Sequence, residues 1–197
     1  MRNILIIGQG YVGKAMKRFF ENHYNVTAYD VKDNAPFPEY NFDLAVVCVP
    51  TPMLPDGRCD ISFVSDSIKT ANAEMIIIKS TVPPGTTDHL SSGLGKNIVF
   101  SPEFCGESSY WTPYGFHKEI IETPWFIFGG KRELCSKAID YFMSVAGPTK
   151  DYRITDARTA ELVKYWENTF YAMKVTFCNE MFDVCKSIGV DLSLIHI

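Results

Sequence analysis

The sequence predicts an α/β protein with a doubly wound parallel sheet. Short apolar runs alternate with segments of helical periodicity over about the first 150 residues. Several of these runs are continuously apolar, which is typical of strands buried on both faces of a parallel sheet. The first run leads directly into the glycine-rich turn Gly8–Gly13. We therefore expect βαβ units joined by right-handed crossovers.

The expected elements follow in chain order. The predicted strands are apolar and bounded by charged or turn-forming residues: Asn3–Ile7, Asn25–Tyr29, Leu44–Val49, Glu74–Lys79, Asn97–Phe100 and Trp125–Phe128. The segments between them repeat apolar residues every three or four positions, which predicts these helices: Val12–Asn22, Asp60–Ala73, Thr86–Ser92 and Lys131–Val145.

A long helix is predicted after the sheet. The stretch Thr155–Ile188 contains no proline or glycine, and its apolar residues recur every three or four positions. At about 1.5 Å per residue, such a helix extends for about 50 Å, so we expect a spine that begins a second, truncated domain. We expect residues 1–150 to form the sheet domain and residues 151–191 a long central helix region that builds a dimer. The tail Leu192–Ile197 (LSLIHI) matches a translated sequencing adapter, so we expect it to be non-native.

Composition favours a cytoplasmic protein. The formal net charge of −4 gives no basic surface for nucleic acid. No apolar run approaches the roughly 18 residues that a membrane span needs, and the N-terminus lacks the pattern of a signal peptide. The six cysteines form no CxxC pair. We therefore expect reduced thiols, no metal site, and neither nucleic acid nor membrane as a partner.

The glycine pattern Gly8-x-Gly10-x-x-Gly13 has the setting that a dinucleotide site requires. A strand precedes it, a helix follows it, and Asp30 ends the second strand about 20 residues later. The pyrophosphate would lie on the positive end of the helix. Asp30 would accept hydrogen bonds from the ribose hydroxyls and repel a 2′-phosphate, which favours NAD over NADP, although Lys32 lies close enough to attract that phosphate. Residues 1–150 are therefore expected to be an NAD-binding Rossmann domain.

Four further stretches carry a family resemblance. They are VPTP (Val49–Pro52), KSTVPPGTT (Lys79–Thr87), SPEF (Ser101–Phe104) and the helical AELVKYWENTFYAMKVTFCNE (Ala160–Glu180). Together they resemble the UDP-glucose/GDP-mannose 6-dehydrogenase family, from Ile4 to about Asp191. The resemblance implies NAD bound on an N-terminal Rossmann domain, a nucleotide-sugar substrate oxidised from the C6 alcohol to the uronate with two NAD, and a homodimer built through the long helix.

The resemblance also assigns roles to individual residues. Glu103 corresponds to the catalytic glutamate, Thr81 lies near the reacting sugar or a catalytic water, and Lys164 and Asn168 reach the substrate from one face of the helix. An ammonium beside an amide suits developing oxyanion charge. The residues assigned to the cofactor are Gly8, Gln9, Gly10, Tyr11, Val12, Gly13, Asp30, Val49, Pro50, Thr51, Pro52, Ser80 and Glu107, the last of which matches the second acidic position of the family.

One family feature has no counterpart in the sequence. The family's nucleophile is a cysteine in a glycine-rich segment, followed closely by lysine and aspartate, and no such segment occurs here. We therefore expect the chain to bind NAD without completing the oxidation. Two alternatives remain at this point: a fragment of a β-hydroxyacid-type dehydrogenase, which STVPPGT and SPEF disfavour, and a non-enzymatic NAD-binding module. We expect Glu161 and Glu180 to make helix-surface or interdomain contacts.

Overall fold

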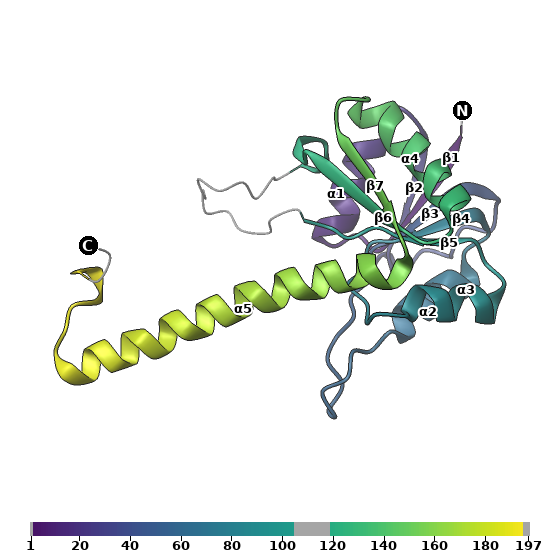
Figure 1. Ribbon diagram of the computed structural model, residues 1–197. Helices are drawn as coiled ribbons and strands as arrows, with labels where there is room; N and C mark the ends of the chain where they lie inside the picture. Colours follow the sequence, from purple (N-terminus) through teal and green to yellow (C-terminus); the bar gives the residue numbers. More distant parts are fainter. Residues whose placement is uncertain (1, 105–118, 195–197) are drawn as a thin grey trace.

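The computed structural model describes residues 2–104 and 119–194 and contains a seven-stranded sheet with the order β2-β1-β3-β4-β5-β6-β7 (Figure 1). The strands are β1 Asn3–Ile7, β2 Asn25–Tyr29, β3 Phe42–Val47, β4 Ala73–Ile78, β5 Ile98–Phe100, β6 Trp125–Gly129 and β7 Asp151–Thr155. Neighbouring strands pair in parallel except at β5–β6. The expected Rossmann-type α/β class is confirmed.

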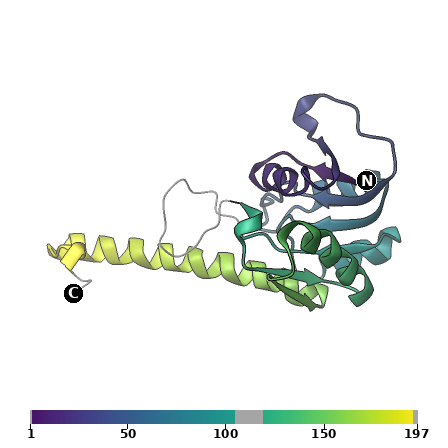
Figure 2. The same ribbon diagram turned by 90° about the horizontal axis from the view of Figure 1, so that it is seen from above.

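Five α-helices accompany the sheet in the described residues: α1 Tyr11–Phe20, α2 Ser62–Thr70, α3 Thr86–Leu94, α4 Arg132–Ala146 and α5 Ala157–Ile188. Helices α1 and α4 cover one face, while α2, α3 and the first turn of α5 cover the other (Figures 1 and 2). Short 3₁₀ turns follow β2 at Val31–Asp33, precede β6 at Ile120–Glu122 and follow α5 at Leu192–Leu194. Across residues 2–104 and 119–194, no helix combines the length and apolar character that a membrane span requires.

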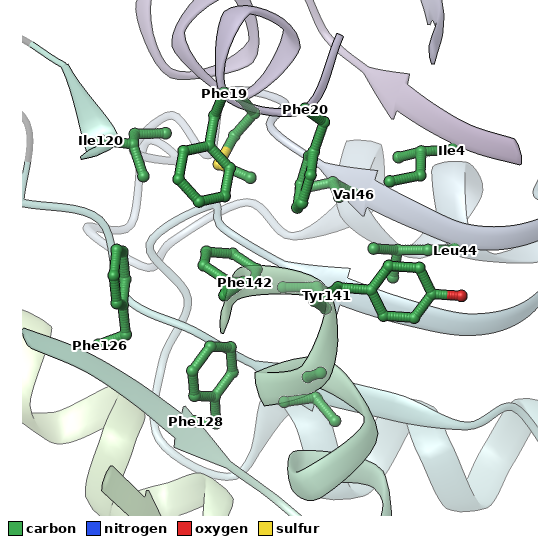
Figure 3. Close-up of a cluster of buried hydrophobic side chains, with 14 of the residues drawn as sticks. Ile4, Phe19, Phe20, Leu44, Val46, Ile120, Phe126, Phe128, Tyr141 and Phe142 are labelled. Carbon is green, nitrogen blue, oxygen red and sulfur yellow. The ribbon is translucent and has the colours of Figure 1, made fainter. Parts of the chain in front are cut away.

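The core under α1 and α4 is built from aromatic rings. Figure 3 shows Phe142 of α4 surrounded by Phe19 of α1 and by Phe126 and Phe128 of β6. The Phe142 ring centroid lies 5.2 Å from that of Phe19 and 5.0 Å from that of Phe128. Such edge and tilted contacts add to the hydrophobic gain of burying each ring. Strand β6 has a single residue pair with β5, Phe100 with Gly129, so this core supplies much of its attachment to the domain.

The structure corrects two expectations about the sheet. The predicted parallel sheet has one antiparallel pair, at β5–β6, because β6 and β7 run opposite to the first five strands. Strand β7 was not predicted at all. It lies at the sheet edge, where Asp151 and Arg153 are exposed and form an ion pair of 2.6 Å, so its sequence DYRIT lacks the apolar run of a buried strand.

The first turns of α5 are fixed to the domain by a buried carboxylate. Glu161 is completely buried, and its side chain accepts hydrogen bonds from the backbone N–H of Gly85 (2.5 Å), the N–H of Thr87 (2.8 Å) and the hydroxyl of Thr87 (2.6 Å). These donors belong to the first turn of α3 and the residue before it, where helical N–H groups have no partner within the helix. Burial raises the pKa of Glu161, and the hydrogen bonds from Thr87 and Gly85 oppose that rise. Of the two contacts expected for Glu161, a helix-surface contact is wrong, because the side chain is buried against Gly85 and Thr87.

Close packing reinforces this attachment. A side chain placed on Gly129, the last residue of β6, would have its Cβ 2.5 Å from Cβ of Ala160 and 2.9 Å from the carbonyl oxygen of Asp156. Beyond this contact α5 leaves the domain, as Figures 1 and 2 show. Every residue from Thr169 to Glu180 is exposed. The long helix therefore has a short anchored start and a long projecting arm.

Replacing Glu161 by alanine should lower the free energy of unfolding by about 2–4 kcal/mol, because buried donors on Thr87 and Gly85 lose their acceptor. Glu180→Ala, on the exposed arm of the same helix, is the matched control and should change stability by less than about 0.5 kcal/mol. Urea unfolding monitored by circular dichroism measures both. Equal stabilities for the two variants would contradict the anchoring role.

Candidate functional site

A glycine turn joins β1 to α1 through two very close backbone approaches. Gly8 has φ +91°, and a Cβ on it would lie 2.6 Å from the carbonyl oxygen of Cys48. A Cβ on Gly13 would lie 1.8 Å from the carbonyl oxygen of Gly8. Gly10, by contrast, faces open space, with no atom within 4 Å of a Cβ placed there. That opening in front of the α1 N-terminus fits the diphosphate of a dinucleotide, which needs close access to backbone N–H groups.

Asp30 is held in place at the end of β2. Its carboxylate oxygens accept hydrogen bonds from the backbone N–H of Gln9 (2.7 Å) and of Lys32 (3.0 Å). Both hydrogen bonds lower the pKa of Asp30, and the bond from Lys32 contributes more than the bond from Gln9. Asp30 is therefore ionised at neutral pH, with a fixed orientation, which suits an acceptor for ribose hydroxyls.

A single cleft of about 1040 Å³ runs along the carboxyl ends of the strands. Its walls contain most of the residues that the sequence predicts for the site: Gly8, Gly10, Tyr11, Val12, Asp30, Val49, Pro50, Thr51, Ser80, Thr81, Glu103, Lys164 and Asn168. Residues from both ends of the chain therefore meet in one cavity.

Three of the described site residues, Gln9, Gly13 and Pro52, do not line the cleft. Gln9 supports it, because its backbone N–H binds Asp30 and its side-chain amide donates to the carbonyl of Gly8 (2.9 Å). Gly13 lies buried under the turn, and the carbonyl of Pro52 accepts a hydrogen bond from the N–H of Asp60 (2.8 Å). Glu107 lies outside the described residues.

Hydroxyl groups tie the ends of β3 and β4 together at the cleft. The Ser80 hydroxyl donates to the carbonyl of Val49 (2.6 Å), and the Thr51 hydroxyl donates to the carbonyl of Thr81 (2.8 Å). Both hydroxyl protons are thus engaged with backbone oxygens. These residues fix the two loops that form the middle of the cleft.

Helix α5 closes one side of the cleft. The Lys164 ammonium lies 3.3 Å from a carboxylate oxygen of Glu167 and 4.9 Å from the ring centroid of Phe104. One turn further along, Asn168 also borders the cleft. Between them, Tyr165 hydrogen-bonds with Cys59. Burial, and to a smaller extent this hydrogen bond, raises the pKa of Tyr165 to about 12. The thiol of Cys59 lies 3.8 Å from the carbonyl oxygen of Thr51, so α5 is also linked to the loop after β3.

Lys79 and Cys48 are among the cleft residues for which the sequence motifs predict no role. Lys79 is buried and lies 3.7 Å from Glu103, measured from Nζ to Oε2. The sequence feature that could have indicated Lys79 is its position as a charged residue at the end of the apolar run EMIIIK. Cys48 also borders the cleft, and its burial raises the pKa of the thiol, with Lys79 acting in the opposite direction. Cys48 is therefore a protonated thiol at neutral pH and a poor nucleophile.

Comparison with known proteins agrees with this geometry. A family model described as "UDP-glucose/GDP-mannose dehydrogenase family, NAD binding domain" matches residues 38–142, and the central-domain model of the same family matches residues 158–196. The chain is 32% identical over 158 residues to UDP-N-acetyl-D-mannosamine dehydrogenase of Methanocaldococcus jannaschii, covering 76% of this chain and 36% of that protein. The enzyme of the same name from Methanococcus vannielii is 28% identical over 234 residues, covering 98% of this chain and 53% of that protein.

Solved structures show the same fold. A UDP-glucose dehydrogenase from Pyrobaculum islandicum superposes with a TM-score of 0.79 at 24% identity, covering 97% of this chain and 54% of that one. In its longer alignments the chain thus spans about half the length of the proteins it matches. The resemblance inferred from the sequence motifs is confirmed, and NAD is the cofactor of the matched domain. The chain belongs to the UDP-glucose/GDP-mannose dehydrogenase family.

Proposed function

We propose that the protein to which this chain belongs oxidises the C6 alcohol of a nucleotide sugar to the uronate with two NAD. In this proposal the chain supplies the NAD site and part of the reacting centre. The observation that carries it is the shared cleft, in which Gly10 and Asp30 line the same cavity as Glu103, Lys164 and Asn168. A binding module that used NAD alone would have no need of an ammonium, an amide and a carboxylate at the same cavity.

The cleft residues suit the first oxidation step. NAD held at Gly10 and Asp30 would supply the hydride acceptor for C6, and the proton of the alcohol would pass to solvent water as the hydride leaves. The ammonium of Lys164 and the amide of Asn168 lie one helical turn apart and stabilise the developing oxyanion. Glu103 activates or relays water at the later hydrolytic step, and Thr81 contacts the sugar or that water. Glu107 completes the acidic pair of the family.

The second oxidation needs a nucleophile that holds the aldehyde. Cys48 borders the cleft, but its raised pKa keeps the thiol protonated. We therefore assign this step to a cysteine outside the described cleft, and we expect the 197-residue chain alone to bind NAD without producing a uronate.

We propose that the exposed arm of α5 forms a homodimer. Five large apolar residues at spacings of three or four are exposed along one stripe of the helix: Leu162, Trp166, Phe170, Met173 and Phe177. A stripe of this size is unusual on a monomer surface, and a second copy offers the same stripe.

We place the protein in the cytoplasm, consistent with free cysteines among the described residues.

Replacing Asp30 by alanine should weaken NAD binding about 10- to 100-fold, because charge-assisted bonds to the ribose are lost. The preference for NAD over NADP should fall as well, since the repulsion of the 2′-phosphate disappears. Isothermal titration of the chain with each nucleotide measures both effects. Asp33→Ala, on the exposed turn nearby, should keep the parent affinities. Unchanged NAD affinity in Asp30→Ala would contradict the assigned ribose site.

The reaction itself is tested in the complete protein. Lys164→Met should lower kcat for nucleotide-sugar oxidation about 10²–10³-fold, because the oxyanion loses its charged partner. Lys137→Met, an exposed position on α4, serves as the control. Activity should be measured as NADH formation with UDP- and GDP-sugars. A protein that binds NAD yet oxidises none of them would support the non-enzymatic alternative.

Replacing Phe177 by glutamate should convert a dimer into a monomer. Phe177 is 63% exposed in the single chain, and burying such a ring is worth about 1.5–3 kcal/mol in each copy. Sedimentation velocity at micromolar concentration distinguishes the two states. Tyr40→Glu, an equally exposed aromatic position away from α5 (63%), should remain dimeric. A monomeric parent chain would count against the proposed interface.

A further inference from the structure

The floor of the cleft contains a buried ammonium group. The side chain of Lys79, directly after β4, is 1% exposed. Its Nζ donates to the hydroxyl of Ser101 (3.1 Å) and to the carbonyl of Pro102 (3.4 Å), and it lies 5.1 Å from the ring centroid of Phe142. A buried ammonium is costly unless an anion compensates it. The carboxylate that does so is Glu103, at 3.7 Å.

Glu103 is held from two sides. Its residue is 8% exposed, one oxygen accepts a hydrogen bond from the N–H of Phe104 (2.7 Å), and the other faces Lys79. Lys79 and Glu103 both contribute to the wall of the cleft. The Phe104 ring in turn lies under the Lys164 ammonium and against Trp125, with ring centroids 4.4 Å apart. The segment after β5 is thus fixed between a buried lysine below and the α5 lysine above.

We infer that Lys79 is a positioning residue, which keeps Glu103 ionised and oriented toward the cleft. The inference rests on the proposed function, in which Glu103 is the carboxylate that activates water. Only an ionised carboxylate can take a proton from water, and that proton then moves to a Glu103 oxygen. A nearby positive charge favours the ionised form. The same contact limits how far the carboxylate can turn away from the reacting centre.

The protonation state of Glu103 tests this inference directly. The carboxyl ¹³C signal of Glu103 can be followed by NMR in the labelled chain, and it is assigned as the signal missing from Glu103→Gln. In the parent it should keep the chemical shift of a carboxylate between pH 8 and pH 6. In Lys79→Met, which retains the length of the side chain without its charge, it should move toward that of a carboxylic acid over the same range. Lys96→Met, which removes an ammonium bonded to the carbonyl of Ala71 (2.7 Å), should behave like the parent.

A second measurement covers the case in which Lys79→Met fails to fold. The double variant Lys79→Met/Glu103→Gln removes both charges, so it should melt at a higher temperature than Lys79→Met alone. A Glu103 signal that stays in the carboxylate range in folded Lys79→Met, or a double variant that melts no higher than the single one, would overturn the inference.

The failure of the proposed function would look different. Parent-like turnover by Glu103→Gln in the complete protein would remove the role of Glu103 in water activation, and with it the positioning role of Lys79. The ion pair between Lys79 and Glu103 would still determine the Glu103 chemical shift in the NMR titration and the order of the melting temperatures.

Discussion

The buried carboxylate of Glu161 is the interaction on which the arrangement of the site depends. It satisfies unpaired N–H groups at the start of α3 and is completely buried in doing so. Because it belongs to the second turn of α5, it fixes both the position and the rotation of that helix. Lys164 follows three residues later and Asn168 seven residues later, which places both on the same side of the helix. From Thr169 to Glu180 every residue of α5 is exposed, and this part of the helix projects from the domain (Figure 2).

The two ends of the cleft differ in how far apart in the chain their residues lie. Its dinucleotide end is built from neighbouring residues, since the glycine turn and Asp30 lie within one βαβ unit and are joined by the hydrogen bond from Gln9 to Asp30. Its reacting end is built from segments far apart in the chain. Lys79, Glu103 and Lys164 approach one another because β4 and β5 end at the same edge of the sheet and α5 crosses that edge. The first end belongs to the NAD binding domain of the family, and in the proposed function the second end determines the chemistry.

This difference explains what the sequence could predict. The bounds of β1 and β2 follow from local apolar runs and agree with the structure, and most predicted site residues line one cleft. Contacts between distant segments determine the burial of Glu161, the pairing of Lys79 with Glu103 and the hydrogen bond between Tyr165 and Cys59. No local sequence pattern predicts such contacts. The reversed direction of β6 and the edge strand β7 were missed for related reasons: strand direction is set by the connection, and an edge strand need not be apolar.

A crystal structure of the chain with NAD would show whether one cleft joins the cofactor to Glu103 and Lys164. We expect the diphosphate at the N-terminus of α1 beside Gly10, the adenosine ribose on Asp30, and the nicotinamide between Thr81 and Lys164. A nicotinamide ring directed away from Glu103 and Lys164, or NAD bound outside this cleft, would show that the cofactor and these side chains do not share a site.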